Sequence, residues 1–153
     1  MGEVGEMTLR ATSFRRAEAP QGTPFDIVVL DAEARHVRRR LITLQHGDDV
    51  LLDFDKPVKL EHGDQLVLED GRTAEVIAAA EDLLEVRGRD GEHLARLAWH
   101  IGNRHLPARI EASRILIHRD RIIADMLRGL GAEIAEVREA FAPEAGAYHA
   151  HGH

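Results

Sequence analysis

The first half of the chain alternates short apolar runs with turn-forming pairs. Between residues 23 and 80, Gly-Asp or Asp-Gly pairs separate several of these runs. Glycine in such a pair can adopt a positive φ, and aspartate can close the turn through its side chain. Short runs at this spacing are typical of an all-β module. The predicted strands are Phe25–Leu30, Leu41–Leu44, Val50–Phe54, Gln65–Leu68 and Thr73–Ile77.

The spacing of apolar residues changes after residue 81. Glu92–Asn103 and Asp120–Leu130 carry apolar residues three and four positions apart, which predicts two amphipathic helices. Asp120 can cap the second helix and Gly131 can end it. With the strands around them, the helices give the order β-α-β-β-α-β, in which two helices cover one face of a four-stranded antiparallel sheet. The predicted strands are Leu83–Val86, Ala108–Ala112, Ile115–Ile117 and Ile134–Arg138.

The sequence therefore predicts an α+β protein in three parts. Residues 1–80 form a β-rich N-terminal domain, and residues 81–140 form a second domain that contains the two helices. Residues 141–153 contain Pro, Gly and small residues without apolar periodicity, so little offsets the entropy lost on ordering them. We expect this last part to be a flexible tail.

Composition and charge narrow the possible functions. The 153 residues include 27 acidic and 20 basic side chains, and the formal net charge of −7 disfavours nucleic acid and anionic membranes as partners. The chain has neither a secretory leader nor a long apolar stretch, so we expect a soluble, cytoplasmic protein. Because it has no cysteine, a bound metal would need His, Asp or Glu ligands.

Three of the ten histidines alternate at the end of the chain, at His149, His151 and His153. In an extended segment such residues point the same way, so the three imidazoles could converge on one metal ion. An affinity tag or a solvated tail is the alternative, but tags are normally unbroken histidine runs, whereas Ala and Gly separate these residues. The pattern favours metal binding.

A fourth candidate, His105, follows the first predicted helix. Gly102 and Asn103 favour a left-handed turn, and Pro107 cannot continue a helix, so we expect His105 to be exposed on that turn. By itself, a histidine at a helix end is more typical of a dipole partner or a solvated side chain than of a ligand. We expect His93 and His100 to be surface residues.

The remaining histidines carry weaker signals. His118 precedes the second helix, where a capping or surface role is more typical than ligation. The positions of His36, His46 and His62 indicate loop residues. The chain shows no phosphate-binding glycine loop, no nucleophile elbow and no zinc-peptidase helix motif, and these absences argue against an enzyme.

The segment Gly102-Asn103-Arg104-His105, with His100 before it, resembles the signature of the UreE family of urease accessory proteins. The similarity extends to the end of the chain, where Phe141-x-Pro-Glu-x-Gly-Ala-Tyr148 precedes the histidine tail. The N-terminal half agrees more loosely, through Arg38-Arg39-Arg40, Gly63-Asp64 and Glu69-Asp70-Gly71.

This resemblance implies a nickel metallochaperone without catalytic residues. Its second domain would be ferredoxin-like, and its first would resemble the peptide-binding modules of co-chaperones. In the implied homodimer, His105 of each subunit would face the other and hold one Ni(II), while the tail histidines complete the shell. Zn(II) or Cu(II) could bind in vitro. The implied partners are the urease GTPase accessory protein and the complex of apourease with its accessory proteins.

One departure from the family concerns the number of metal ions that the protein can bind. Some relatives carry extra histidines where this chain has Arg119-Asp120-Arg121, and others have much longer histidine tails. With three tail histidines, we expect no store of many ions.

Two other functions compete with a metal carrier. A metallohydrolase would need a buried set of ligands with an open coordination position and a positioned carboxylate base. A peptide-binding co-chaperone would carry its tail histidines incidentally. Truncation of Tyr148–His153 distinguishes the last alternative, because only a metal carrier should then bind metal more weakly.

Overall fold

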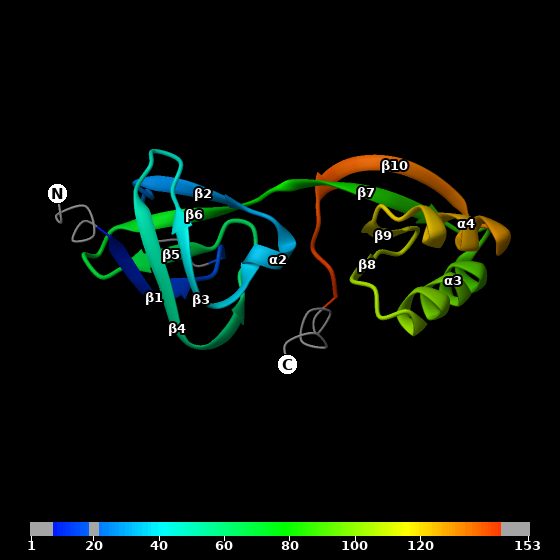
Figure 1. The fold of residues 1–153 in the computed structure, drawn as a ribbon, viewed down its shortest axis with the longest axis horizontal. Helices are drawn as coiled ribbons and strands as arrows, with labels where there is room; N and C mark the ends of the chain where they lie inside the picture. Colours follow the sequence, from blue (N-terminus) through cyan, green and yellow to red (C-terminus); the bar gives the residue numbers. More distant parts are fainter. Residues whose placement is uncertain (1–7, 19–21, 145–153) are drawn as a thin grey trace. The chain divides into compact units, whose positions relative to one another are not determined.

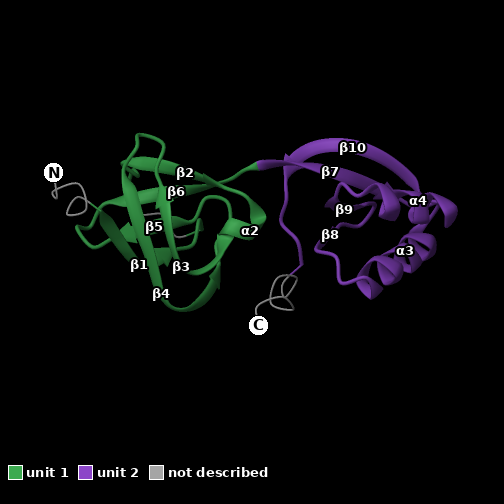
Figure 2. Cartoon of the chain, in the orientation of Figure 1, with its two compact units in different colours: residues 1–79 green, residues 80–153 purple. Residues whose placement is uncertain are grey.

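The computed structural model describes residues 8–18 and 22–144. The chain divides into two compact units, Met1–Ala79 and Ala80–His153 (Figure 2). Each unit has its own hydrophobic core. The α+β fold expected from the sequence is confirmed.

The first unit contains a curved six-stranded sheet (Figure 1). Its elements are β1 (Leu9–Arg15), β2 (Asp26–Leu30), α2 (Ala32–Arg35), β3 (His36–Thr43), β4 (Asp49–Lys59), β5 (Gln65–Leu68) and β6 (Thr73–Ala78). The strands lie in the order β2-β6-β5-β1-β4-β3. Strand β1 runs parallel to β4, and β2 runs parallel to β6; the other neighbours are antiparallel.

Two elements of this unit were not predicted. Strand β1 has no regular alternation of apolar and polar residues, and Ala11 is its one buried residue. Its pairing with β5 also shifts register between Ala11 and Ser13. The short helix α2 is capped by the Asp31 carboxylate, which accepts a hydrogen bond from the Ala34 N–H. Strand β3 also begins earlier than expected, since its exposed arginines, Arg38–Arg40, conceal the strand pattern.

The second unit has the predicted β-α-β-β-α-β order. Its elements are β7 (Ala80–Arg87), α3 (Gly91–Asn103), β8 (Ala108–Ile110), β9 (Ile115–His118), α4 (Arg121–Gly129) and β10 (Glu133–Ala140). The strands lie in the order β10-β7-β9-β8, and all three pairs are antiparallel. This is the ferredoxin-like arrangement, with both helices packed against the sheet.

Aspartates start both helices of this unit. The Asp120 carboxylate accepts a hydrogen bond from the Ile123 N–H at 3.0 Å, which is the predicted cap of α4. The Asp90 carboxylate accepts one from the His93 N–H at 2.8 Å and caps α3. Each bond satisfies a backbone donor that the first turn of a helix leaves unpaired.

Both faces of the four-stranded sheet bury apolar side chains. Leu84 on β7 and Ile117 on β9 belong to the core beneath the helices. Because strand side chains alternate, Leu83 and Leu116 point to the opposite face, and both are fully buried there. Phe141, just after β10, is also fully buried. Phe141 therefore belongs to the folded unit although it lies beyond β10.

Candidate metal centre

His105 lies on the turn that follows α3. The Arg104 N–H bonds back to the carbonyls of Ile101 and Gly102, and the His105 N–H donates to the Gly102 carbonyl at 3.0 Å. His105 itself has a φ of 58° and is, within the described ranges, the single residue other than glycine with a positive φ. Histidine is among the residue types that tolerate this left-handed conformation.

Helix α3 ends at Asn103 as predicted, but the expected place of the left-handed residue was wrong. Gly102 and Asn103 are still helical, and the reversal falls on His105. The physical reason lies in the next two residues: the helical conformation is disfavoured for a residue before proline, so Leu106 does not continue the helix ahead of Pro107. The chain therefore has to reverse by His105.

The turn presents its imidazole to solvent. Gly102, Asn103, Arg104 and His105 are all exposed. In the part of the chain that the structure describes, the His105 side chain has no hydrogen-bond or ion-pair partner. His105 is therefore exposed, as expected from the sequence.

The described residues of one chain do not assemble a complete metal site. Among residues 8–18 and 22–144, no three His, Asp or Glu side chains lie close enough to hold one ion. His149, His151 and His153 lie outside the described residues. Within the described part, the candidate site therefore consists of one exposed imidazole on a backbone turn.

His93 is buried, so its predicted surface position was wrong. Its Nδ1 accepts a hydrogen bond from the Arg89 N–H at 2.9 Å, so the ring proton lies on Nε2, which donates to the Leu130 carbonyl at 2.8 Å. Both ring nitrogens are thereby used within the fold. The sequence did carry a signal, because His93 lies four residues before Leu97 on the apolar face of α3.

His118 also has partners within its own unit. Its Nε2 lies 2.9 Å from a carboxylate oxygen of Glu81, and its ring packs against Phe141 with the centroids 4.5 Å apart. His100 is partly buried, and its ring contacts Trp99 edge to face. Neither histidine joins His105 in a ligand group among the described residues.

The histidines of the first unit contact other residues of that unit. The His46 imidazole lies 2.9 Å from the buried carboxylate of Asp26. Burial raises the pKa of Asp26, but the N–H groups of Ile27 and His46 and the His46 ring outweigh it and leave this pKa below its ordinary value. His62 accepts a hydrogen bond from Ala78. His36 begins strand β3 and is not a loop residue.

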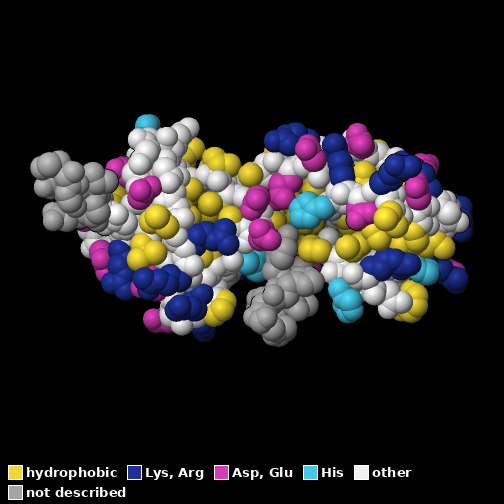
Figure 3. Space-filling view, in the orientation of Figure 1, with side chains coloured by type: hydrophobic (Ala, Val, Ile, Leu, Met, Phe, Trp, Pro, Cys, Tyr) yellow, Lys and Arg dark blue, Asp and Glu magenta, His cyan; other side chains and the backbone are white. Residues whose placement is uncertain are grey.

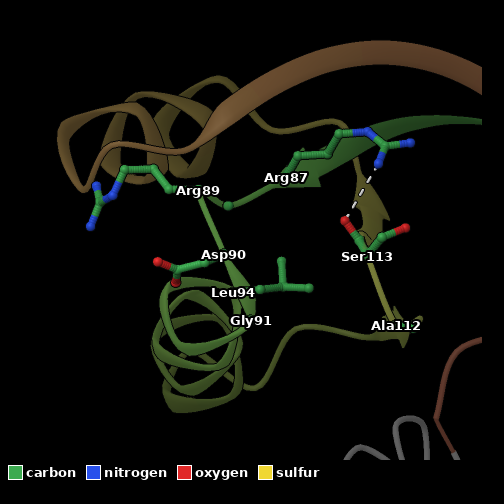
Figure 4. A pocket seen from close by; sticks show the side chains of 8 residues that line it. Arg87, Arg89, Asp90, Gly91, Leu94, Ala112 and Ser113 are labelled. Atoms are coloured by element: carbon green, nitrogen blue, oxygen red, sulfur yellow. Dashed lines mark hydrogen bonds between the residues drawn. The ribbon is translucent and has the colours of Figure 1, made fainter.

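A hollow of about 300 Å³ at the start of α3 has no histidine in its lining. It is lined by Arg87, Gly88, Arg89, Asp90, Gly91, Leu94, Ala112 and Ser113. Figure 4 shows the Arg89 side chain pointing away from the cavity and Arg87 turned toward the Ser113 carbonyl. Arg87 is also paired with Glu85 at 2.9 Å. This hollow has no ligand set for a metal ion.

Comparison with known proteins covers both units. The family model of the UreE urease accessory protein N-terminal domain matches residues 10–79, and that of the C-terminal domain matches residues 81–153. This chain belongs to the UreE family of urease accessory proteins. The UreE family consists of accessory chaperones in urease maturation, not of enzymes, and the metallohydrolase hypothesis is accordingly set aside.

Individual UreE relatives are similar to this chain along most of their length. Urease accessory protein UreE 1 of Brucella suis is 54% identical over 140 residues, which cover 91% of this chain and 86% of that protein. The UreE protein of Rhizobium rhizogenes is 52% identical over 143 residues, covering 94% of this chain and 86% of the relative. That of Chelativorans is 52% identical over 145 residues, covering 95% and 90%. In the described residues, no helix is long and apolar enough to cross a membrane.

Proposed function

We propose that this protein is a cytoplasmic nickel carrier that delivers Ni(II) to the urease activation complex. Residues 1–80 serve partner binding, residues 81–140 metal binding and dimerisation, and residues 141–153 carry the histidine tail beyond their first, packed residues. The observation that carries the proposal is the exposed His105 imidazole on its left-handed turn. A non-glycine residue held in such a conformation is a common mark of functional sites.

The proposed site needs ligands from outside the described part of one chain, because no three-ligand group exists within it. A two-fold dimer supplies a second His105 without any further residue, since an isologous interface brings the same patch of both subunits together. His149, His151 and His153 then provide the remaining imidazoles. One ion per dimer is the stoichiometry of such a site.

Exposed apolar side chains support a homodimer through the second unit. Trp99 on α3 is 64% exposed, Ile122 on α4 is 78% exposed and Ile110 on β8 is 44% exposed. Figure 3 shows hydrophobic side chains gathered on the surface of this unit around α4. Apolar side chains gathered in one exposed patch, as around α4, are typical of a surface that meets a partner.

The ligand chemistry selects the class of metal. Imidazole ligands suit Ni(II), Cu(II) and Zn(II), and by the usual stability order they hold Cu(II) more tightly than Ni(II). Zn(II) and Cu(II) therefore bind in vitro, and nickel specificity in the cell comes from metal supply and from the partner. With three histidines in the tail, the protein carries few ions and does not store many.

A carrier must also release its ion. Ordering the tail opposes binding by about 1 kcal/mol for each residue that becomes fixed. A site that is shared between subunits and completed by such a tail opens readily. The partners that receive the ion are the urease GTPase accessory protein and the complex of apourease with its accessory proteins.

The first unit is suited to partner contact. Strand β3 lies at the edge of its sheet and carries three exposed arginines, Arg38–Arg40. A sheet edge can bind an extended peptide by adding it as a further strand. This arrangement supports a peptide-binding role for the unit beside metal transport by the second unit.

Urease activation under limiting nickel tests this function. Apourease with its accessory proteins is supplied with stoichiometric Ni(II) and with the wild-type protein, His105→Ala or a chain truncated before Tyr148. We expect both variants to activate less urease than the wild type, and excess free Ni(II) to narrow the difference. Equal activation by the wild type and by both variants would support a co-chaperone that acts without carrying metal.

A further inference from the structure

The chain beyond β10 crosses from one edge of the second sheet to the other. Strand β10 is one edge strand and β8 is the other. β10 ends at Ala140, and four residues later the Glu144 N–H donates to the Ala108 carbonyl on β8 at 2.8 Å. Figure 1 shows this segment running past the ends of β9 and β8. We call residues 141–144 the strap.

The strap is fixed at its start by a buried ring. Phe141 is 0% exposed, and its ring centroid lies 4.5 Å from that of His118. His118 is itself held by Glu81, 2.9 Å from its Nε2. Pro143 is also buried, whereas Ala142 and Glu144 are exposed. Alternate strap residues therefore face the unit, as in an added strand.

The strap ends close to the turn that carries His105. Its hydrogen-bond partner Ala108 is three residues beyond His105 in the sequence. Glu144 also lines a hollow of about 210 Å³ together with Gly102 and Leu106, which lie on the two sides of the turn along the chain. The other residues of this lining are apolar: Ala98, Ile101, Ala108 and Ile110. The histidine tail thus begins at this hollow.

We infer that the strap is a positioning element for metal capture, because it fixes the start of the histidine tail beside the His105 turn. The inference rests on the proposed function. His149 is five residues beyond Glu144 but nine beyond Ala140. At about 3.4 Å per residue, the fixed strap limits the reach of His149 to about 17 Å, against about 31 Å for a tail that starts at Ala140. A shorter tether raises the effective concentration of the tail histidines at the turn.

A double-mutant cycle on the full chain tests the strap. Phe141→Ala is made in the intact protein and in a chain truncated before Tyr148, and Ni(II) affinity is measured by calorimetry. Exposed Ala142→Ser is the matched control on the same strap. From tether length alone we expect Phe141→Ala to weaken binding about two-fold or more in the intact chain and to leave the truncated chain unchanged. Equal loss in both backgrounds would mean that Phe141 acts only through the fold.

A second variant avoids any damage to the folded unit. A Gly-Ser segment of about ten residues is inserted between Glu144 and Ala145, and the control carries the same segment after His153. Tripling the tether should weaken Ni(II) binding about five-fold, while the control keeps wild-type affinity. Electron paramagnetic resonance of the Cu(II) form should then show fewer bound imidazole nitrogens in the internal insertion at equal metal loading. Identical affinities and spectra for the two insertion variants would contradict the positioning role of the strap.

The proposed function and the strap can fail separately. If His105→Ala binds Ni(II) as the wild type does, the carrier site itself is wrong. If His105→Ala binds weakly while the Phe141 and insertion variants match their controls, the site stands and only the positioning role is lost.

Discussion

The Nε2–H of His93 donates to the Leu130 carbonyl at 2.8 Å and so joins the first turn of α3 to the residue that ends α4. The same ring accepts the Arg89 N–H on its other nitrogen. One buried imidazole thereby satisfies a backbone group just before α3 and another at the end of α4. This histidine belongs to the fold and not to the metal site.

Replacing His93 should destabilise the second unit without removing the metal site. His93→Ala leaves a backbone donor and a backbone acceptor unpaired, which should lower the free energy of unfolding by about 2–4 kcal/mol. His100→Ala on the same helix is the control, and we expect a smaller loss there. Calorimetric unfolding checks the difference. A wild-type transition for His93→Ala would contradict the structural role.

Arg114 holds three glutamates on the sheet of the second unit. Its guanidinium lies 2.9 Å from Glu85, 2.8 Å from Glu111 and 2.7 Å from Glu139. Hydrogen bonds from Arg87 and Arg114 lower the pKa of Glu85, and Arg114 lowers that of Glu111. A lowered pKa in the folded state means that this stabilisation is present above the ordinary carboxyl pKa and is lost as pH falls.

Arg114→Met should therefore destabilise the protein in a pH-dependent way. At pH 7 we expect a loss of about 2 kcal/mol in the free energy of unfolding, because three carboxylates lose a common partner. The loss should shrink as pH falls below about 4.5, where unfolded carboxyls are protonated. Arg96→Met, which removes an exposed pair with Glu92, is the control. Denaturant titrations at pH 7 and pH 3.5 measure the difference in free energy of unfolding between the wild type and Arg114→Met. An equal difference at the two pH values would contradict this prediction.

His105→Gly should separate stability from metal binding. Glycine adopts a φ of 58° without a steric penalty, so we expect stability to stay level or rise by about 1 kcal/mol. Removing the imidazole should still weaken Ni(II) binding. His105→Ala keeps a Cβ and should be less stable than His105→Gly. Thermal melts with parallel Ni(II) titrations test both effects, and unchanged Ni(II) binding in either variant would exclude His105 as a ligand.

Metal affinity should also depend on pH. A histidine ligand binds metal only in its neutral form, and the ordinary pKa of imidazole is about 6.5. Ni(II) affinity should therefore be level above pH 7.5 and fall steeply below about pH 6.5. Titrations at pH 5.5, 6.5 and 7.5 in one ionic strength check this. A constant affinity across the series would indicate carboxylate ligands.

The sequence predicted features that depend on local periodicity and missed those that depend on distant contacts. Alternation and helical spacing predicted most strands and both long helices, and Asp120 was correctly expected to cap α4. Strand β1 was missed because its partners β4 and β5, and not its own pattern, hold it in the sheet. The burial of His93 was indicated by its position on the apolar face of α3, but its hydrogen bond to Leu130, 37 residues away, could not be predicted from local periodicity.

The candidate site was predicted in part. Pro107 and the helix pattern were sufficient to expect an exposed His105 on a turn, but the position of the left-handed residue depends on how far the helix continues. The Glu144–Ala108 hydrogen bond could not be predicted from sequence, since it joins two segments that are 36 residues apart. The roles of His149, His151 and His153 stay a prediction.

The most direct test of the carrier site is Ni(II) calorimetry combined with mass determination of the oligomer, on the wild type and on His105→Ala. We predict a wild-type dimer with its tightest site near one ion per dimer, and a His105→Ala dimer that lacks this site. If His105→Ala keeps the tightest site at the same stoichiometry, the ion is held elsewhere and the exposed turn at the end of α3 is not the metal centre.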